Sequence, residues 1–190
     1  MTDHTLTARS AFSKQPDQHE GLTLAAIEPP AIVSIAIPNG GEAALLAALQ
    51  GAYTIDLPVV GRTAVSATTN ATLLRLARDQ MFVLFPQPAS GRPTDAIADA
   101  LGDTAYLTDQ SDSWAALRIA GSNCRAALER ICPLDLDAAT FPPGMVARTA
   151  MEHLGVIMVC EAADTYLLLS ARSSADDFLH AVETSARNVT

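Results

Sequence analysis

Three short apolar segments follow one another closely in the last third of the chain. They span residues 145–151, 156–161 and 165–170, and large apolar or β-branched side chains dominate them, as is typical of strands. Only a few residues separate each segment from the next. Because parallel strands need a crossover of about a dozen or more residues, these segments predict an antiparallel meander. A doubly wound parallel sheet is therefore excluded for this part of the chain.

One helix is predicted before the meander in the sequence and another after it. Residues 113–119 form a strand whose core face carries Ala115, Leu117 and Ile119. A helix then starts at Ser122 and ends at Pro133. Its buried stripe has helical spacing: Cys124, Ala127, Leu128 and Ile131. The last helix opens at Ser173 and buries a second such stripe: Ala175, Phe178, Leu179, Val182 and Ala186.

The first half of the chain has a similar plan with weaker signals. Residues 31–37 predict a buried strand, followed by a helix that Asn39 caps and Gly51 ends. Residues 72–77 and 81–85 flank a short polar turn and predict a hairpin. Residues 94–101 predict another short helix.

These segments divide the chain into three parts. Residues 1–20 are polar, lack an apolar period and predict a flexible N-terminal arm. Residues 21–103 form a first α+β half and residues 104–190 a second. The predicted fold class is α+β, with antiparallel sheets packed by helices.

Composition limits the partners and the compartment. Lys and Arg total 12 against 21 Asp and Glu, and the net charge of −9 opposes binding to nucleic acid. No segment has the apolar length of a signal peptide or a membrane span. Three cysteines in apolar contexts indicate reduced thiols. We therefore expect a cytoplasmic protein that binds neither nucleic acid nor a membrane.

Patterns for catalysis are weak. His153 has no second histidine at a metal-binding spacing, and Cys124, Cys132 and Cys160 show no C-x-x-C pattern. Asn39-Gly40-Gly41 lacks the remaining residues of a phosphate-binding loop. We predict no catalytic, cofactor-binding or metal-binding residue on this chain.

A run of residues in the second half resembles one family. Its opening pattern comprises Asp109, Ser111, Trp114, Leu117, Ile119 and Gly121. The later matches are Leu128, Asp135-Leu136-Asp137, Phe141, Gly144, Arg148-Thr149, Leu169-Ser170 and Arg172-Ser173. In order and spacing, this set resembles the gamma subunit of heterotetrameric sarcosine oxidase, which is related to the folate-binding aminomethyltransferases. The resemblance is best over residues 104–187 and looser over residues 30–102.

This resemblance implies a fold like the folate-binding domain of aminomethyltransferases. It also implies a non-catalytic subunit that assembles and stabilises a complex in which sarcosine is oxidatively demethylated to glycine. The implied partners are the alpha, beta and delta subunits, and these carry NAD, tetrahydrofolate, FAD, covalent FMN and zinc. One alternative is a free-standing, folate-binding, aminomethyltransferase-like protein that uses Asp109, and another is a generic small-molecule-binding α+β domain. The competing interpretation of Asp109, which is followed by Ser111 and Asp112, is a turn or cap.

Three side chains are candidates for partner contacts. Arg148 and Arg172 lie in the matching segments, and a guanidinium can hold a carboxylate of a neighbouring subunit through two hydrogen bonds. Trp114, the only tryptophan, is the candidate interface anchor. The competing interpretation is an internal ion pair for each arginine and a core position for the tryptophan.

Overall fold

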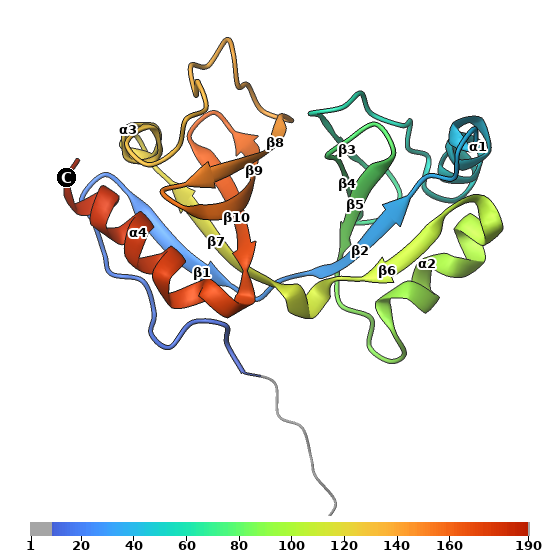
Figure 1. Cartoon of the computed structure of the whole chain (residues 1–190), viewed down its shortest axis with the longest axis horizontal. Helices are drawn as coiled ribbons and strands as arrows, with labels where there is room; N and C mark the ends of the chain where they lie inside the picture. Colours follow the sequence, from blue (N-terminus) through green and yellow to red (C-terminus); the bar gives the residue numbers. More distant parts are fainter. Residues whose placement is uncertain (1–8, 190) are drawn as a thin grey trace, which may run out of the picture.

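The computed structural model describes residues 9–189 and contains two five-stranded sheets (Figure 1). We call the sheet with the order β1-β7-β10-β9-β8 the C-terminal sheet, and the sheet with the order β3-β4-β5-β2-β6 the N-terminal sheet. The strands of the C-terminal sheet are β1 (Thr23–Ile27), β7 (Trp114–Ala120), β8 (Val146–Met151), β9 (Leu154–Ala162) and β10 (Thr165–Ala171). Those of the N-terminal sheet are β2 (Ala31–Ala36), β3 (Thr63–Val65), β4 (Thr72–Arg75), β5 (Gln80–Phe85) and β6 (Tyr106–Asp109).

Helices cover the outer face of each sheet, and the inner faces of the two sheets meet (Figure 1). Helices α3 (Cys124–Glu129) and α4 (Ala175–Arg187) lie against the C-terminal sheet. Helices α1 (Glu42–Tyr53) and α2 (Pro93–Leu101) lie against the N-terminal sheet. Strand pairing between residues 9 and 189 is antiparallel throughout, and β8, β9 and β10 form the predicted meander. The predicted α+β class is confirmed.

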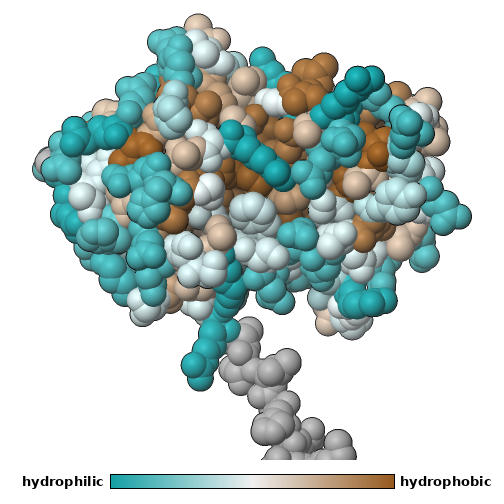
Figure 2. Space-filling model, in the orientation of Figure 1, coloured by the Kyte–Doolittle hydropathy of each residue, from teal (hydrophilic) through white to brown (hydrophobic). Residues whose placement is uncertain are grey.

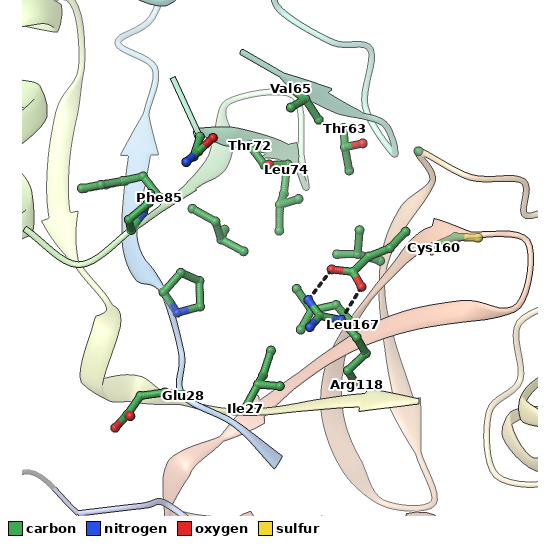
Figure 3. A pocket seen from close by; sticks show the side chains of 17 residues that line it. Ile27, Glu28, Thr63, Val65, Thr72, Leu74, Phe85, Arg118, Cys160 and Leu167 are labelled. Carbon is green, nitrogen blue, oxygen red and sulfur yellow. Dashed lines mark hydrogen bonds and ion pairs between the residues drawn. The ribbon is translucent and has the colours of Figure 1, made fainter. Parts of the chain in front are cut away.

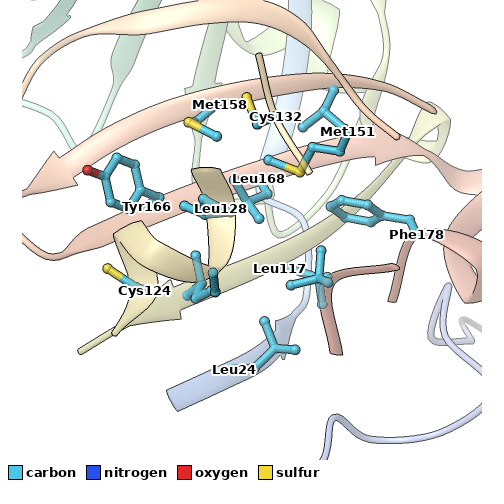
Figure 4. Close-up of a cluster of buried hydrophobic side chains, with 14 of the residues drawn as sticks. Leu24, Leu117, Cys124, Leu128, Cys132, Met151, Met158, Tyr166, Leu168 and Phe178 are labelled. Carbon is cyan, nitrogen blue, oxygen red and sulfur yellow. The ribbon is translucent and has the colours of Figure 1, made fainter. Parts of the chain in front are cut away.

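Three buried clusters hold these layers together. One lies between the C-terminal sheet and its helices, and includes Leu117, Leu128, Tyr166 and Phe178 (Figure 4). A second lies under α1 and α2. The third joins the two sheets: Ile32, Leu74, Phe82, Leu84, Ala116, Val146, Ile157, Val159, Leu167 and Leu169. The two faces of β7 enter different clusters, because alternate strand residues point to opposite sides.

Each sheet takes one strand from beyond the predicted boundary between residues 103 and 104. Strand β1 precedes β2 in the chain but pairs with β7, and β6 pairs with β2. Glu28, Pro29 and Pro30 link β1 to β2, and the short 3-10 helix Ser111–Ser113 links β6 to β7. Both connections therefore run from one sheet to the other. The predicted boundary between residues 103 and 104 stays a prediction.

Helices α1 and α3 differ from the prediction at their ends. Helix α1 continues past Gly51 to Tyr53, because Thr54 in the left-handed conformation ends it and donates its N–H to the carbonyl of Gln50. Gly41, rather than Asn39, precedes this helix. Helix α3 ends at Glu129, four residues before Pro133, and a turn follows it in which the N–H groups of Ile131 and Cys132 both donate to the Leu128 carbonyl.

Part of the predicted flexible arm lies outside the described residues, namely residues 1–8. Residues 9–20 pack along α4, with Phe12 buried in the first cluster. Glu183, 1% exposed, anchors them from the helix: its carboxylate accepts from Lys14 Nζ at 2.8 Å and from the Asp17 N–H at 2.8 Å. Ser13 N–H donates to Asp176 at 2.8 Å. These contacts fix residues 13–17 on the helix surface.

Replacing Lys14 with methionine is expected to loosen this segment. The buried Glu183 carboxylate then keeps the Asp17 N–H but loses its charged donor, and buried charges require such partners. We expect faster amide hydrogen exchange in residues 13–17 and unchanged exchange in β9 and β10. Lys14→Arg is the matched control and should retain most of the protection. Equal protection in Lys14→Met and the wild type would contradict this role.

Candidate interaction surface and inter-sheet cleft

A cleft of about 630 Å³ lies between the inner faces of the two sheets (Figure 3). Thr63, Val65 and Thr72 line it from the N-terminal sheet, and Arg118 and Leu167 line it from the C-terminal sheet. It forms because the inter-sheet cluster fills only part of the space between the sheets. Its walls combine aliphatic side chains with polar ones such as Asn70 and Thr72, and Pro30, Phe85 and Pro86 add apolar surface beside β2 and β5. A cleft of this size and lining can hold a small molecule or a segment of another chain.

One ion pair lies in the wall of this cleft. Arg118 donates to both carboxylate oxygens of Glu161, from Nε at 2.6 Å and from Nη2 at 2.9 Å (Figure 3). The two residues lie on β7 and β9. These hydrogen bonds raise the pKa of Arg118, and they occupy both oxygens of the carboxylate. The two charges therefore neutralise each other within the wall.

The candidate contacts Trp114 and Arg148 converge on one ring. Trp114 packs edge-on against Phe82, with 5.7 Å between ring centroids, and the Arg148 guanidinium lies 5.7 Å from the centroid of the same ring. Arg148 Nη2 also donates to the Gln80 side chain at 3.0 Å. Trp114 is half-buried, and Arg148 is exposed. The two side chains therefore bridge the sheets through Phe82, while Arg148 retains accessible donors.

Arg172 lies apart from this pair. Its Nη2 donates to the backbone carbonyl of Arg9 at 2.6 Å, which attaches the start of the described chain to the end of β10. The guanidinium also borders a small hollow of about 180 Å³ that Glu28 and Pro29 help to form. The structure thus brings together two of the three predicted contacts, and gives the third a contact within the chain.

Asp109 accepts two local hydrogen bonds. Its Oδ1 binds the N–H of Ser111 at 3.0 Å and the hydroxyl of Ser111 at 2.7 Å. The Ser111 hydroxyl in turn accepts from the Ile32 N–H at 3.0 Å. Asp109 therefore caps the turn between β6 and β7, and it is not among the residues that line the cleft. Across residues 9–189, no three His, Cys, Asp or Glu side chains cluster as metal ligands would.

The three cysteines are free and buried. Burial raises the pKa of the Cys124 thiol to about 11, and also raises the pKa of Cys160. A folded-state pKa above the unfolded value means that the folded state keeps the proton at a pH where the unfolded state releases it. The free energy of unfolding should therefore fall as the pH rises from about 8.5 to about 11.

Urea unfolding measured across this pH range checks that expectation. Cys124→Ala should give a shallower decline than the wild type, because the raised thiol pKa is removed. Cys132→Ala is the control for the loss of a buried side chain, because Cys132 belongs to the same cluster. Identical slopes for Cys124→Ala and the wild type would show that this thiol does not titrate as the structure implies.

The comparison with protein families concerns most of the chain. The model of the sarcosine oxidase, gamma subunit family matches residues 38–187 of the 190 residues. The chain belongs to the sarcosine oxidase gamma subunit family. This confirms the family resemblance and the gamma-subunit role that it implied. A comparison with curated proteins found no match.

Two solved structures resemble this gamma-subunit chain in fold. The heterotetrameric sarcosine oxidase from Corynebacterium sp. U-96, in complex with pyrrole 2-carboxylate, has a chain that aligns with a TM-score of 0.76 and 21% identity. That alignment covers 92% of this chain and 88% of the other. Aminomethyltransferase T of the Bartonella henselae glycine cleavage system aligns with a TM-score of 0.56 and 12% identity. It covers 86% of this chain but 46% of the transferase, so this chain spans about half of that enzyme's length.

Three exposed valines on β3 or just before it were not predicted from the gamma-subunit sequence. Val59 and Val60 are 69% and 52% exposed, and Val65 on β3 is 68% exposed. No element was predicted between the first helix and the hairpin, so these residues received no assignment. Consecutive valines after Pro58, in a segment without an amphipathic period, are the signal that could have identified them. Among the helices of residues 9–189, none has the length and apolar content needed to span a membrane.

Proposed function

We propose that this chain acts as the gamma subunit of a cytoplasmic sarcosine oxidase without holding a cofactor of its own. It assembles and stabilises a heterotetramer that oxidatively demethylates sarcosine to glycine. Its partners are the alpha, beta and delta subunits, which hold NAD, tetrahydrofolate, FAD, covalent FMN and zinc. The observation that carries this proposal is the family match over residues 38–187, supported by the fold shared along 92% of the chain with a heterotetrameric oxidase.

The chemistry of the described residues supports a role in assembly. Three sets of polar groups are engaged within the chain: Asp109 caps a turn, Arg118 pairs with Glu161, and Glu183 holds residues 14–17. The carboxylates of Asp109, Glu161 and Glu183 therefore each accept at least one hydrogen bond from their own chain. By contrast, Arg148 is exposed and can donate to a carboxylate of a neighbouring subunit.

Binding to the folded state stabilises it in proportion to the logarithm of partner concentration over the dissociation constant. A gamma subunit that buries partner surface would therefore raise the apparent stability of those partners, and they would raise its own. Stable interfaces bury roughly 1,200–2,000 Å² in total. A chain with 9932 Å² of accessible surface can supply its half of such an interface from one face.

Co-expression with the other three subunits tests this function. A tag on this chain should recover all of them, together with the visible absorbance of flavin. Omitting this chain should lower the yield and the melting temperature of the remaining complex while leaving its flavin bound. Recovery of this chain alone, colourless and with stoichiometric affinity for a reduced folate, would favour the folate-binding alternative.

A further inference from the structure

Exposed apolar side chains gather on β3 and on the segment before it, and one of them, Val65, lines the inter-sheet cleft. Across residues 9–189, four large apolar residues are exposed: Val59, Val60, Val65 and Tyr106. Three of the four lie on β3 or on the segment that leads into it, while Tyr106 lies on β6, at the opposite edge of the N-terminal sheet. Figure 2 shows apolar side chains in the middle of one face, between the sheets, and another apolar patch at its upper edge. Such contiguous patches mark interaction surfaces.

The cleft is electrically balanced on an otherwise acidic chain. Two hydrogen bonds join Arg118 to Glu161, so the charged pair in its wall is internally compensated. Glu28 is the other charged lining residue, and its labelled side chain points away from the cavity in Figure 3. The whole chain carries a net charge of −9. An apolar occupant without net charge fits this lining, and interface cores are depleted of charged residues in the same way.

Strand β3 offers backbone groups at the same place. It is an edge strand, and Ala64 pairs with Leu73 while Ser66 N–H donates to the Ala71 carbonyl at 2.9 Å. Because antiparallel pairing alternates along a strand, the N–H and C=O of Val65 point away from β4. On that outer side Thr63 N–H already donates to the Gly144 carbonyl at 2.8 Å. An extended segment can pair with the outer edge at Val65 and place its side chains in the cleft.

We propose that the inter-sheet cleft, with Val65 at its edge, docks an extended, apolar, uncharged segment of a partner subunit. This rests on the proposed function, because it assumes that partner subunits bind this chain. The segment pairs with β3 at Val65, because residues 144–146 already pair with residues 61–63, and its apolar side chains enter the space between Leu74, Leu84 and Leu167. Backbone pairing supplies the orientation, and the apolar walls supply most of the affinity.

Two variants with matched exposure test the location. The double variant Val59→Glu with Val65→Glu places one carboxylate at the docking edge and one on the segment that leads into β3, and Tyr106→Glu places one on the opposite edge of the sheet. All three positions are more than half exposed, so each variant should fold, with circular dichroism as the check. In co-expression with the other three subunits, we expect the double variant to recover at least about tenfold less of them. Tyr106→Glu should recover them within about twofold of the wild type.

The outcomes separate the docking proposal from the proposed function. If the wild-type chain recovers no oxidase subunit, the proposed function fails and the docking proposal falls with it. If the wild type recovers them and the folded double variant recovers as much, the cleft is not the docking site. An equal loss of partner recovery in the double variant and in Tyr106→Glu also overturns the location. Added negative charge, at either edge of the sheet, would then explain the loss.

Cross-linking in the assembled oxidase gives a second readout. A photo-reactive residue at position 65 should link to a partner subunit, and mass spectrometry of the linked peptide should show an apolar segment. The same residue at position 106 should give no such link. A complete complex in which position 65 links to no protein overturns the proposal and leaves the cleft to a small-molecule occupant.

Discussion

Replacing Phe178 with alanine should lower the free energy of unfolding by about 3–5 kcal/mol. Phe178 lies on α4 with 0% exposure, and it points into the cluster between that helix and the C-terminal sheet (Figure 4). Removing the ring loses its transfer free energy and leaves a cavity that the surrounding strands fill only in part. Urea denaturation followed by circular dichroism measures the change, which is a large fraction of a typical total stability of about 5–15 kcal/mol.

Phe178→Leu is the matched control for this effect. It keeps an apolar side chain at the same helix position, so the cavity is smaller and the loss should be less than half of that for alanine. Val65→Ala, at an exposed edge position, should change the free energy of unfolding by less than about 0.5 kcal/mol. A loss below about 1 kcal/mol for Phe178→Ala would contradict the packing of α4 on this sheet.

Gly121→Ala is the second substitution with a large expected effect, about 3 kcal/mol of lost stability. Gly121 follows β7 with a φ of +117°, a conformation that residues with a side chain rarely adopt. A β-carbon built there lies 2.5 Å from the carbonyl oxygen of Gly21, so the backbone before β1 would have to move. Because Thr23 pairs with Ala120, we expect the substitution to separate the start of β1 from β7.

Gly51→Ala provides a control with the opposite sign. Gly51 is exposed on α1, and a β-carbon there meets no atom within 4 Å. Alanine has the higher helix propensity, so this variant should gain about 0.5–1 kcal/mol. Urea unfolding gives both values, and hydrogen exchange in residues 21–27 shows where Gly121→Ala acts. Unchanged protection of these residues in Gly121→Ala would contradict the close approach of the two strands.

Elements with a strong periodic pattern of apolar residues could be predicted from the sequence. The meander of β8, β9 and β10 follows from apolar runs with short connections, and the buried face of α4 follows from helical spacing. The strands β1, β3 and β6 were not predicted. Each has three to five residues and lies at the edge of a sheet, and the stability of β1 comes from pairing with β7, far along the chain. Local propensity carries little information about such pairings.

The interaction surface was predictable only in part. Trp114 and Arg148 were selected as single residues, but their common contact with Phe82 depends on how the sheets face each other. The cleft arises from the same arrangement, so no local pattern could indicate it. Asp109 illustrates the reverse case, because an Asp two residues before a Ser at a strand junction predicts a turn cap, and the structure contains that cap.

The most direct test of the central claim is native mass spectrometry of the oxidase isolated through a tag on this chain. The gamma-subunit account predicts one dominant species whose mass equals one copy of this 19.9 kDa chain plus one copy of each of three other subunits, with flavin retained. Mild dissociation should release this chain without a cofactor. A dominant species containing this chain alone, or this chain carrying a bound flavin or folate, would contradict the account.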